Sequence, residues 1–408
     1  MPPLTARFLL EAAAALGTVC CLSFYFLSAL SLASFLTDRR KKDRRKELKQ
    51  APLPERQLPP VSILKPLKGI DPAIWENFCS YCEQEYPEFQ LIFGVSDPGD
   101  PAIEVVRKLQ AEYPNLPIEL IVCDRVLGTN IKVSNLVQML PAARHEHILV
   151  NDSDIRVPAD YLRKVIAPLA EDSVGLVTCL YRGVASLTLG SRLEALGIGI
   201  DFVPGVLSAR FLERGLHFGL GSTLAFRRRD LESIGGFEEL LDYLADDYEL
   251  GRRIASTGKK VELSAATVTT FLPAYTLGQF FRHQLRWSRT IRDVRGWGYA
   301  GLLFTFGLSW ALATLVAAHG APWACALFVL TFAARLATGG VAAVFVLHDR
   351  QIFRHDALRN VLLRDVIAPF VWVASFMGNR IHWRGDVFDL KDGRLTIVKP
   401  APSAGLKK

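Results

Sequence analysis

The N-terminal part of the chain begins with a long apolar run. Between Leu9 and Leu36 the only charged residue is Glu11, and a run of this length can cross the roughly 30 Å of hydrocarbon in a bilayer. A secretory signal peptide is the alternative interpretation, but the run is too long and no small-residue cleavage site precedes the charged segment behind it. The pattern therefore predicts a transmembrane helix over residues 1–37.

From residue 61 the pattern changes to short apolar runs that alternate with amphipathic segments. Four of the runs are typical of buried parallel strands, and they cover residues 61–64, 91–95, 118–122 and 148–150. Helical spacing recurs between them, near residues 72–84, 101–113 and 131–141. Strands that alternate with helices indicate a doubly wound α/β sheet, which we expect in a domain at residues 61–275.

Beyond Pro273 the pattern changes again. Residues 276–298 carry apolar side chains at helical spacing, interleaved with arginines. This predicts an amphipathic helix in the membrane interface, with arginines near headgroups or a substrate phosphate; a buried helix docked on the sheet is the alternative, and the two can coexist. Residues 299–347 then predict a hairpin of two membrane spans. Residues 348–408 predict a third hydrophobic or re-entrant segment and a basic cytoplasmic tail.

A basic segment after the apolar run predicts how the chain is oriented in the membrane. Residues 38–49 hold eight basic and three acidic side chains, which is a net +5 of the chain's formal +7. Such a cluster attracts nucleic acid as well as lipid, but directly after an apolar run it is better explained as a positive-inside determinant. We therefore expect an integral membrane protein with a basic juxtamembrane linker at residues 38–60, a cytoplasmic 61–275 domain and no nucleic-acid partner.

Acidic residues follow three of the four predicted strands. Asp152 and Asp154 come directly after the fourth strand, and Asp97 and Asp124 follow the second and third. In extended chain, residues two apart point the same way, so Asp152 and Asp154 converge on one hard cation such as Mg²⁺ or Mn²⁺ carrying a diphosphate. An Asx turn is the alternative for an isolated Asp-x-Asp. Ligands of doubly wound sheets bind beyond the carboxyl ends of the strands, which favours the metal site.

Further candidates lie downstream. Asp246 and Asp247 open a helical pattern, where carboxylates are either helix caps or a general base that deprotonates an alcohol. His283-x-x-Arg286-Trp287 combines a guanidinium suited to diphosphate with an indole suited to stacking a sugar, although such a pair is also a common interface anchor. Residues 219–223, Gly-Leu-Gly-Ser-Thr, indicate either a close approach of backbone to the site or tight sheet packing.

Taken together, these motifs resemble those of membrane-bound family-2-type glycosyltransferases. That pattern is an Asp, an Asp-x-Asp, a Glu/Asp-Asp pair and Gln/Arg-x-x-Arg-Trp. Within the group, the chain is similar to ceramide glucosyltransferases and to related bacterial hopanoid glycosyltransferases. The similarity rests on residues 61–69, 97–103, 132–136 and 152–157. It implies a Rossmann-like GT-A domain flanked by transmembrane helices, a UDP-sugar donor and a lipid acceptor.

The resemblance also implies a role for each matching residue. Asp97 would contact the nucleotide, Asp152 and Asp154 the metal and diphosphate, and Asp247 would be the general base beside Asp246. Arg286 and Trp287 would line the donor diphosphate and the acceptor entrance, and Lys132 is a candidate phosphate contact. Two positions depart from the family pattern: His283 replaces Gln or Arg, and Asp154 stands where ceramide-type enzymes commonly have Gly.

The expected function is inverting transfer of glucose or N-acetylglucosamine from a UDP-sugar to a lipid hydroxyl. The acceptor is a ceramide-type sphingolipid or a hopanoid polyol, and Asp154 favours the bacterial hopanoid-type relatives and hence a bacterial inner membrane. A processive polysaccharide synthase is an alternative, but it would need more spans. A non-catalytic nucleotide-binding scaffold is the other, and the intact Asp152, Asp154 and Asp247 argue against it.

Overall fold

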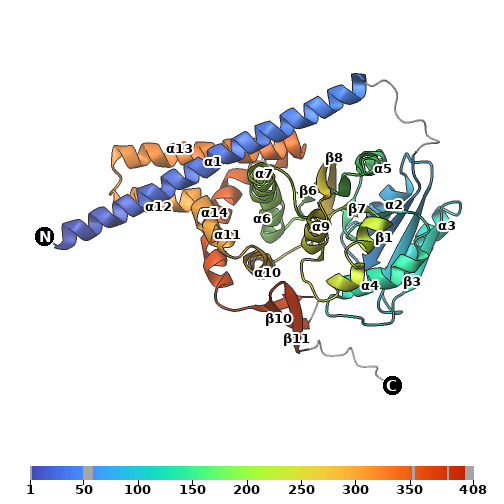
Figure 1. Cartoon of the computed structure of the whole chain (residues 1–408). Coiled ribbons are helices and arrows are strands. Elements are labelled where there is room, and N and C mark those ends of the chain that lie inside the picture. The colour runs from blue at the N-terminus through green and yellow to red at the C-terminus, as the bar shows by residue number, and fades with distance from the viewer. Residues whose placement is uncertain (1, 49–57, 352–353, 384–385, 400–408) are drawn as a thin grey trace. The chain divides into compact units, whose positions relative to one another are not determined.

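The computed structural model describes residues 2–48, 58–351, 354–383 and 386–399 (Figure 1). Its contacts divide the chain into two compact units. The helical unit comprises Met1–Asp38, Leu187–Phe211 and Ala274–Ile381, and the sheet unit comprises Arg39–Ser186, Leu212–Pro273 and His382–Lys408. Residues 49–57 of the expected linker and residues 400–408 of the expected tail lie outside the described residues.

The sheet unit is built on an eight-stranded sheet with the order β3-β2-β1-β4-β7-β6-β8-β5. Its first four strands are mutually parallel, as the apolar runs predict. They are β1 (Val61–Leu67), β2 (Phe89–Val95), β3 (Ile118–Val122) and β4 (His147–Val150). β1 and β2 are buried along their whole length, which explains why apolar residues lie on both of their faces. Ser62, Lys65 and Gln90 are buried polar exceptions.

The second half of the sheet is mixed, which the sequence patterns do not predict. β7 (Leu224–Arg227) runs antiparallel to both β4 and β6 (Val174–Val184). β6 pairs in parallel with β8 (Lys260–Phe271), and β5 (Ile155–Arg156) closes the edge antiparallel to β8. The domain is therefore an α/β sheet of the GT-A type, in which a short antiparallel strand joins two parallel segments.

Helices cover the sheet where the amphipathic segments predict them. These are α2 (Ile74–Cys82), α3 (Ala102–Glu112) and α4 (Ile131–Met139). The unit also contains the short helices α5 (Tyr161–Ile166) and α8 (Arg228–Glu232), and α9 (Asp246–Ser256). Phe78 of α2 packs against Phe93 of β2, with ring centroids 4.8 Å apart. Burial of such aromatic pairs, at about 25 cal/mol per Å² of apolar surface, holds helices onto the sheet.

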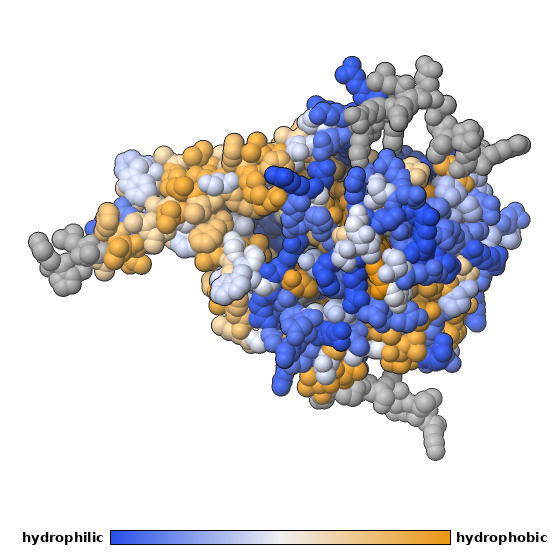
Figure 2. Space-filling model, in the orientation of Figure 1, coloured by the Kyte–Doolittle hydropathy of each residue, from blue (hydrophilic) through white to orange (hydrophobic). Residues whose placement is uncertain are grey.

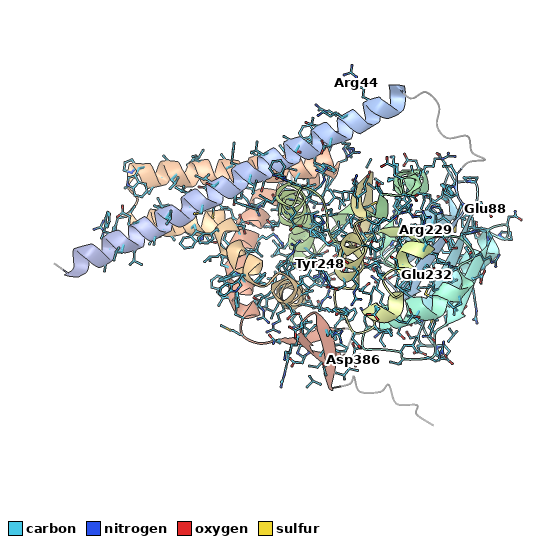
Figure 3. The ribbon with its side chains drawn as sticks, in the orientation of Figure 1. Arg44, Glu88, Arg229, Glu232, Tyr248 and Asp386 are labelled. Carbon is cyan, nitrogen blue, oxygen red and sulfur yellow. The ribbon has the colours of Figure 1, made fainter. Side chains whose placement is uncertain are left out.

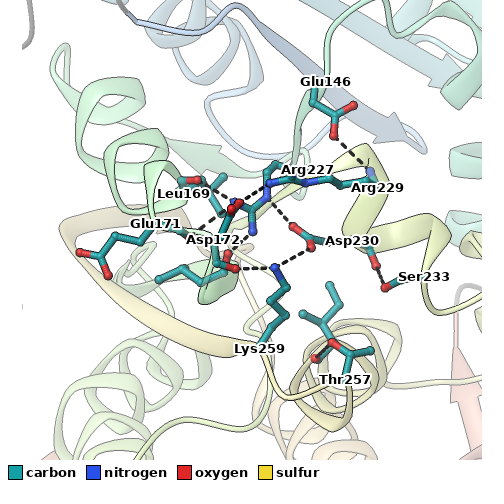
Figure 4. Close-up of polar contacts among 12 residues, drawn as sticks. Glu146, Leu169, Glu171, Asp172, Arg227, Arg229, Asp230, Ser233, Thr257 and Lys259 are labelled. Atoms are coloured by element: carbon teal, nitrogen blue, oxygen red, sulfur yellow. Dashed lines mark hydrogen bonds and ion pairs between the residues drawn. The ribbon is translucent and has the colours of Figure 1, made fainter.

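Arg227, the last residue of β7, forms a network of polar contacts at its end of the sheet (Figure 4). Its guanidinium is buried and donates to Asp230 at 2.6 Å and to the Leu169 carbonyl at 2.9 Å. Beside it lies a cavity of about 650 Å³ lined by residues that include His147 and Arg229. His147 is the first residue of β4, so this cavity lies at the end of the strand away from Asp152.

The helical unit is largely apolar (Figure 2). Three helical segments in the described part of the chain are long and apolar enough to cross a membrane: Ala6–Lys41 of α1 (Pro2–Leu48), Leu189–Leu212, and Pro322–Val346. The first and third match the predicted N-terminal span and the second arm of the predicted hairpin. The first arm is broken, because Trp297–Thr305 and Gly307–Ala317 meet at a bend of 58°.

The segment Leu189–Leu212 comprises α6 (Leu189–Gly197), a π-helical turn and α7 (Val203–Leu212). It falls inside the range that we expected to form the cytoplasmic domain. β6 precedes it and β7 follows it, and these two strands are paired in one sheet. A single crossing by this helix would place the two strands on opposite sides of a bilayer, and their pairing excludes that. Glu194 and Asp201 interrupt its apolar pattern.

α10 (Leu277–Arg295) forms the predicted amphipathic helix and begins with a capping box between Thr276 and Gln279. It packs on α6 and on α14 (Ala357–Ser375). Two of its arginines bind the chain after α14: Arg292 donates to the Ser375 carbonyl and Arg289 to the Arg380 carbonyl. Arg292 therefore binds a carbonyl at the C-terminus of α14, where positive charge is favourable, and Arg289 binds the first residue of β9.

The last described residues form a small sheet of β9 (Arg380–Trp383), β10 (Asp386–Lys391) and β11 (Arg394–Lys399). The amide of Leu395 donates to the Asp242 carbonyl, and that of Leu244 to the Gly393 carbonyl. Because residues 242–244 belong to the sheet unit, β10 and β11 lie on its side of any membrane. Any membrane crossings between residues 273 and 386 must therefore come in pairs, and the cytoplasmic location of the tail stays a prediction.

Candidate functional site

Asp152 stands just beyond the carboxyl end of β4, in the turn that leads to β5. Its Oδ1 atom lies 2.8 Å from Nζ of Lys132, which is on the first turn of α4. The same Nζ atom lies 3.1 Å from Oδ2 of Asp246, at the start of α9. The structure thus brings the Asp-x-Asp motif, the predicted phosphate contact and the second acidic pair together around one ammonium group.

Asp154 is held deeper than Asp152. Its Oδ2 accepts a hydrogen bond of 2.5 Å from Oγ1 of Thr270 on β8. Burial, together with the charge of Asp152, raises the pKa of Asp154 to about 6. Positive charge from a ligand would stabilise the ionised form of this carboxylate further, in addition to the charge of the buried Lys65.

Two residues that the sequence analysis missed support this turn, one on β1 and one just after it. Asp71 accepts a 2.5 Å hydrogen bond from the hydroxyl of Ser153. Lys65 is fully buried, and its Nζ donates to the Asp152 carbonyl at 3.0 Å and lies 3.8 Å from the ring centroid of Tyr81. Burial lowers the pKa of Lys65 to about 7 against the opposing charges of Asp154 and Asp152. Asp71 follows the end of β1, so the strand-end argument used for Asp97 also applies to it.

Asp247 faces the same space from α9. Its Oδ2 accepts the amide of Gly221 at 2.6 Å, and its Oδ1 accepts the amide of Tyr248 at 2.8 Å. Tyr248, labelled in Figure 3, stacks on Phe218 with 5.6 Å between ring centroids. A Cβ atom added to Gly221 would lie 3.1 Å from both Asp247 Oδ2 and Asp152 Oδ2. Gly221 therefore makes the close backbone approach that was one of the two interpretations of the 219–223 motif.

Burial and neighbouring charges shift the pKa values of Asp247 and Lys132. Burial and the neighbouring Asp246 raise the pKa of Asp247 to about 6 against the effect of Lys132. Burial alone would lower the pKa of Lys132, but the carboxylates of Asp152, Asp246 and Asp247 outweigh it and raise the pKa above its ordinary value. At neutral pH, Lys132 is consequently a permanent cation and Asp247 a mostly ionised base.

These residues fit a divalent cation shared with a substrate. Among the described residues, no group of three or more His, Cys, Asp or Glu side chains is arranged to hold a metal by itself. Mg²⁺ typically takes one or two carboxylates and completes its shell with phosphate and water. Asp152 suits that role, because its side chain is 41% exposed and its Oδ2 points to the space beside Gly221. Asp154 as a second ligand stays a prediction.

Asp97 makes a local contact outside the cluster of Lys132 with the acidic residues. It follows β2, and its Oδ1 accepts the amide of Gly99 at 2.8 Å in an exposed Asx turn. The neighbouring Asp100 caps the start of α3 by accepting the Ala102 amide at 2.9 Å. The expected contact of Asp97 with a nucleotide stays a prediction.

The remaining candidates belong to the helical unit. His283 on α10 lies with its Nδ1 3.3 Å from Oε1 of the buried Glu194, and its ring stacks on Tyr275. Trp287 contacts His283 on one side and Phe202 on another. Arg286 lies on the same helix. Their predicted roles in binding substrate stay predictions, whereas Glu194 is a partner that the sequence analysis did not find.

The family model for glycosyl transferase family 21 matches residues 23–396. The chain belongs to this family. The match includes both the carboxylate cluster and most of the C-terminal β-sheet. It confirms the resemblance drawn from the motifs and identifies this family 21 protein as a glycosyltransferase.

Individual relatives agree. Ceramide glucosyltransferase 1 of Caenorhabditis elegans is 24% identical over 361 residues, which cover 85% of this chain and 75% of the relative. Ceramide glucosyltransferase of Candida albicans is 31% identical over 121 residues, 27% of this chain and 22% of the relative. A solved structure of similar fold is the Pyrobaculum calidifontis mannosyltransferase PcManGT in complex with GDP-Man and Mn²⁺. It has a TM-score of 0.50 and 20% identity, and the match covers 90% of this chain and 98% of that one. The last similarity confirms the GT-A-like fold.

Gly221→Ala tests the convergence of the two carboxylates. The methyl group would lie 3.1 Å from Oδ2 of both Asp152 and Asp247, so it would push these groups away from the space that they share. We expect sugar transfer to fall by about 10- to 100-fold, with little change in melting temperature. Gly215→Ala is the matched control, because its added Cβ meets no atom closer than 3.8 Å. Equal activity of the two variants would contradict the proposed geometry.

Proposed function

We propose that this family 21 glycosyltransferase moves a hexose from a UDP-sugar to the hydroxyl of a membrane lipid, with inversion at the anomeric carbon. The observation that carries the proposal is the convergence of Asp247 and Asp152 beside Gly221, at the carboxyl end of the parallel strands. The names of the ceramide glucosyltransferase relatives support a lipid acceptor. The nucleotide sugar in the PcManGT complex supports a nucleotide-linked donor.

In the proposed reaction, a carboxylate of the chain acts as the base and a lysine stabilises the leaving group. Asp247 takes the proton from the acceptor hydroxyl as that oxygen attacks the anomeric carbon and the diphosphate leaves with the bonding electrons. Its raised pKa of about 6 makes it a stronger base than an exposed aspartate and leaves it ionised at neutral pH. Lys132 offers a permanent positive charge to the leaving diphosphate. One base suffices for a single displacement, so no second carboxylate acts as a nucleophile.

Asp152, with Asp154 behind it, would hold a divalent cation. Bound there, Mg²⁺ or Mn²⁺ would offset the negative charge that develops on the diphosphate. Lys65 and the Asp71–Ser153 hydrogen bond fix the turn that carries these carboxylates. The proposal thus assigns positioning to β1 and charge to the β4–β5 turn.

Removal of divalent cations should stop the reaction. We expect exhaustive chelation to reduce transfer to background and added Mn²⁺ or Mg²⁺ to restore it, because the single positive charge of Lys132 cannot neutralise both the diphosphate and the carboxylates of Asp152 and Asp246. The measurement is transfer of radiolabelled sugar in purified membranes, with Ca²⁺ and monovalent salt as controls for ionic strength. Full activity after chelation would rule out the metal role.

The same assay identifies the substrates. Purified membranes are incubated with UDP-glucose or UDP-N-acetylglucosamine and with ceramide or a hopanoid polyol, and the extracted lipids are identified by mass spectrometry. We propose a bacterial inner-membrane location with the sheet unit in the cytoplasm, which the basic segment after the N-terminal span supports. Sugar incorporated only into a growing polymer would instead favour a polysaccharide synthase.

A further inference from the structure

The C-terminal hairpin of β10 and β11 is a well-formed element. Lys391 pairs with Arg394 across the two-residue turn Asp392-Gly393, and both turn residues have positive φ, 54° and 78°. These angles are typical of the type I′ turn that matches the twist of a β-hairpin. The side chains of Phe388, Leu390 and Leu395 are at most 3% exposed, so the hairpin is packed on the protein.

Its turn binds the loop that leads into the second acidic pair. The Leu244 amide donates to the Gly393 carbonyl at 3.0 Å, and the Leu395 amide donates to the Asp242 carbonyl at 2.7 Å. Between these bonds, Arg394 donates from Nε to the Tyr243 hydroxyl at 3.3 Å, and its guanidinium lies 5.2 Å from the centroid of that ring. The backbone of residues 242–244 is therefore paired with the hairpin two residues before Asp246.

The other side of this loop is bound to the start of α4. The Asn130 amide donates to the Leu241 carbonyl at 2.8 Å, and its side chain donates to the Tyr243 carbonyl at 2.8 Å and to Asp246 Oδ1 at 3.3 Å. Asn130 is also the N-cap of the helix that carries Lys132. The loop is thus held between the hairpin and the residues beside the site.

From these contacts we propose that the C-terminal hairpin is a clamp that positions Asp246 and Asp247, with Gly393 and Arg394 as its positioning residues. The inference rests on the proposed function for the role of Asp247. Without the clamp, residues 242–245 lose their hydrogen bonds to the hairpin but keep those to Thr129 and Asn130 and the local bond from the Tyr243 amide to the Leu240 carbonyl. The start of α9 can then shift away from Lys132 and Gly221. A shift of about 1 Å at a reacting group is enough to cost on the order of 10²-fold in rate.

The clamp itself is tested by amide hydrogen exchange on the full-length protein in detergent. Gly393→Val introduces a Cβ atom at a φ of 78°, 3.1 Å from Cδ1 of Tyr243, and Arg394→Ala removes the contact with Tyr243 while leaving the backbone free to pair. We expect faster exchange in residues 241–250 in both variants, stronger for Gly393→Val, and unchanged exchange in β1 and β4. Asp389→Asn, an exposed position on the same hairpin, is the control. Wild-type exchange of residues 241–250 in both variants would overturn the clamp.

The kinetic test separates positioning from general stability. We expect Gly393→Val to lower turnover per UDP-binding site by about 10- to 100-fold, while the UDP dissociation constant changes less than threefold. Arg394→Ala should also lower turnover, and Arg394→Lys should restore part of that loss. In an Asp247→Asn background, Gly393→Val should cost nothing further, because both act through one group.

Faster exchange with unchanged turnover would overturn the positioning role. Additive losses with Asp247→Asn would also overturn it, since they would show that the hairpin acts elsewhere. A wild-type protein without sugar transfer would refute the proposed function, while the exchange measurement would still decide whether the hairpin clamps the loop.

Discussion

Replacement of Asp247 by Asn is expected to reduce sugar transfer by about 10²- to 10⁴-fold, the usual contribution of a general base. The amide has nearly the same shape but does not take up the acceptor proton. Asp247 accepts backbone amides with both oxygens, so the Asn variant loses one of these bonds, at a stability cost of about 1 kcal/mol. Lys132 and Asp152 are unchanged, and UDP binding should therefore survive.

The measurement combines initial rates of transfer with calorimetric titration of UDP. Asp160→Asn is a matched control, because that carboxylate is 44% exposed and forms an ion pair with Lys164, one helical turn away. We expect the control to have wild-type turnover. Unchanged turnover of Asp247→Asn would remove the base assignment, and loss of UDP binding would indicate that Asp247 belongs to the donor site instead.

Local sequence patterns predict the first half of the fold well. The four parallel strands and α2, α3 and α4 come from long apolar runs and helical spacing, which are set by burial of each element. β7 has only four residues, and its antiparallel insertion between β4 and β6 depends on pairing between distant segments. Periodicity contains no information about such partners.

Much of the site could also be predicted, for a simple reason. Parallel strands end at one edge of the sheet, and Lys132 bonded to Asp152 and Asp246 confirms that the motifs meet there. Asp71 was missed although it obeys the same rule. The Asp392-Gly393 turn is a strong hairpin signal, but the basic residues around it led us to expect only a tail. Glu194 could not be found, because its link to His283 depends on helix packing.

A buried charge network in the helical unit shows most clearly what sequence patterns leave out. Arg335 on α13 (Pro322–Val341) donates to Asp365 on α14 at 2.8 and 3.0 Å and to Asp201 at 2.5 Å. Arg364 pairs with the other oxygen of Asp201 at 2.5 Å and bonds Gln284 at 3.3 Å. These contacts join three helical segments to α10. Ion pairs thus connect apolar helices, whereas a hydropathy pattern shows the same charged residues only as breaks in an apolar run.

Arg335→Met is consequently expected to destabilise the protein by about 3–5 kcal/mol, the usual cost of leaving buried charges without a partner. Asp365 would lose the two hydrogen bonds from Arg335, whereas Asp201 would keep Arg364. Thermal unfolding in detergent measures the effect. Arg359→Met on α14 is the control, because Arg359 is 66% exposed and lies 3.9 Å from Asp356, and exposed pairs contribute at most about 1 kcal/mol.

The double variant Arg335→Met/Asp365→Leu distinguishes two causes of instability: the loss of the Arg335–Asp365 hydrogen bonds, and the cost of burying the Asp365 carboxylate without its partner. If the cost comes from the isolated Asp365 carboxylate, removal of that charge should recover a large part of the stability, since well-packed apolar replacements of buried pairs are often neutral. A double variant as unstable as the sum of its parts would instead show that the helices need the hydrogen bonds themselves. In that case the network would act as a geometric lock on α10, and the orientation of His283 and Trp287 would change together with stability.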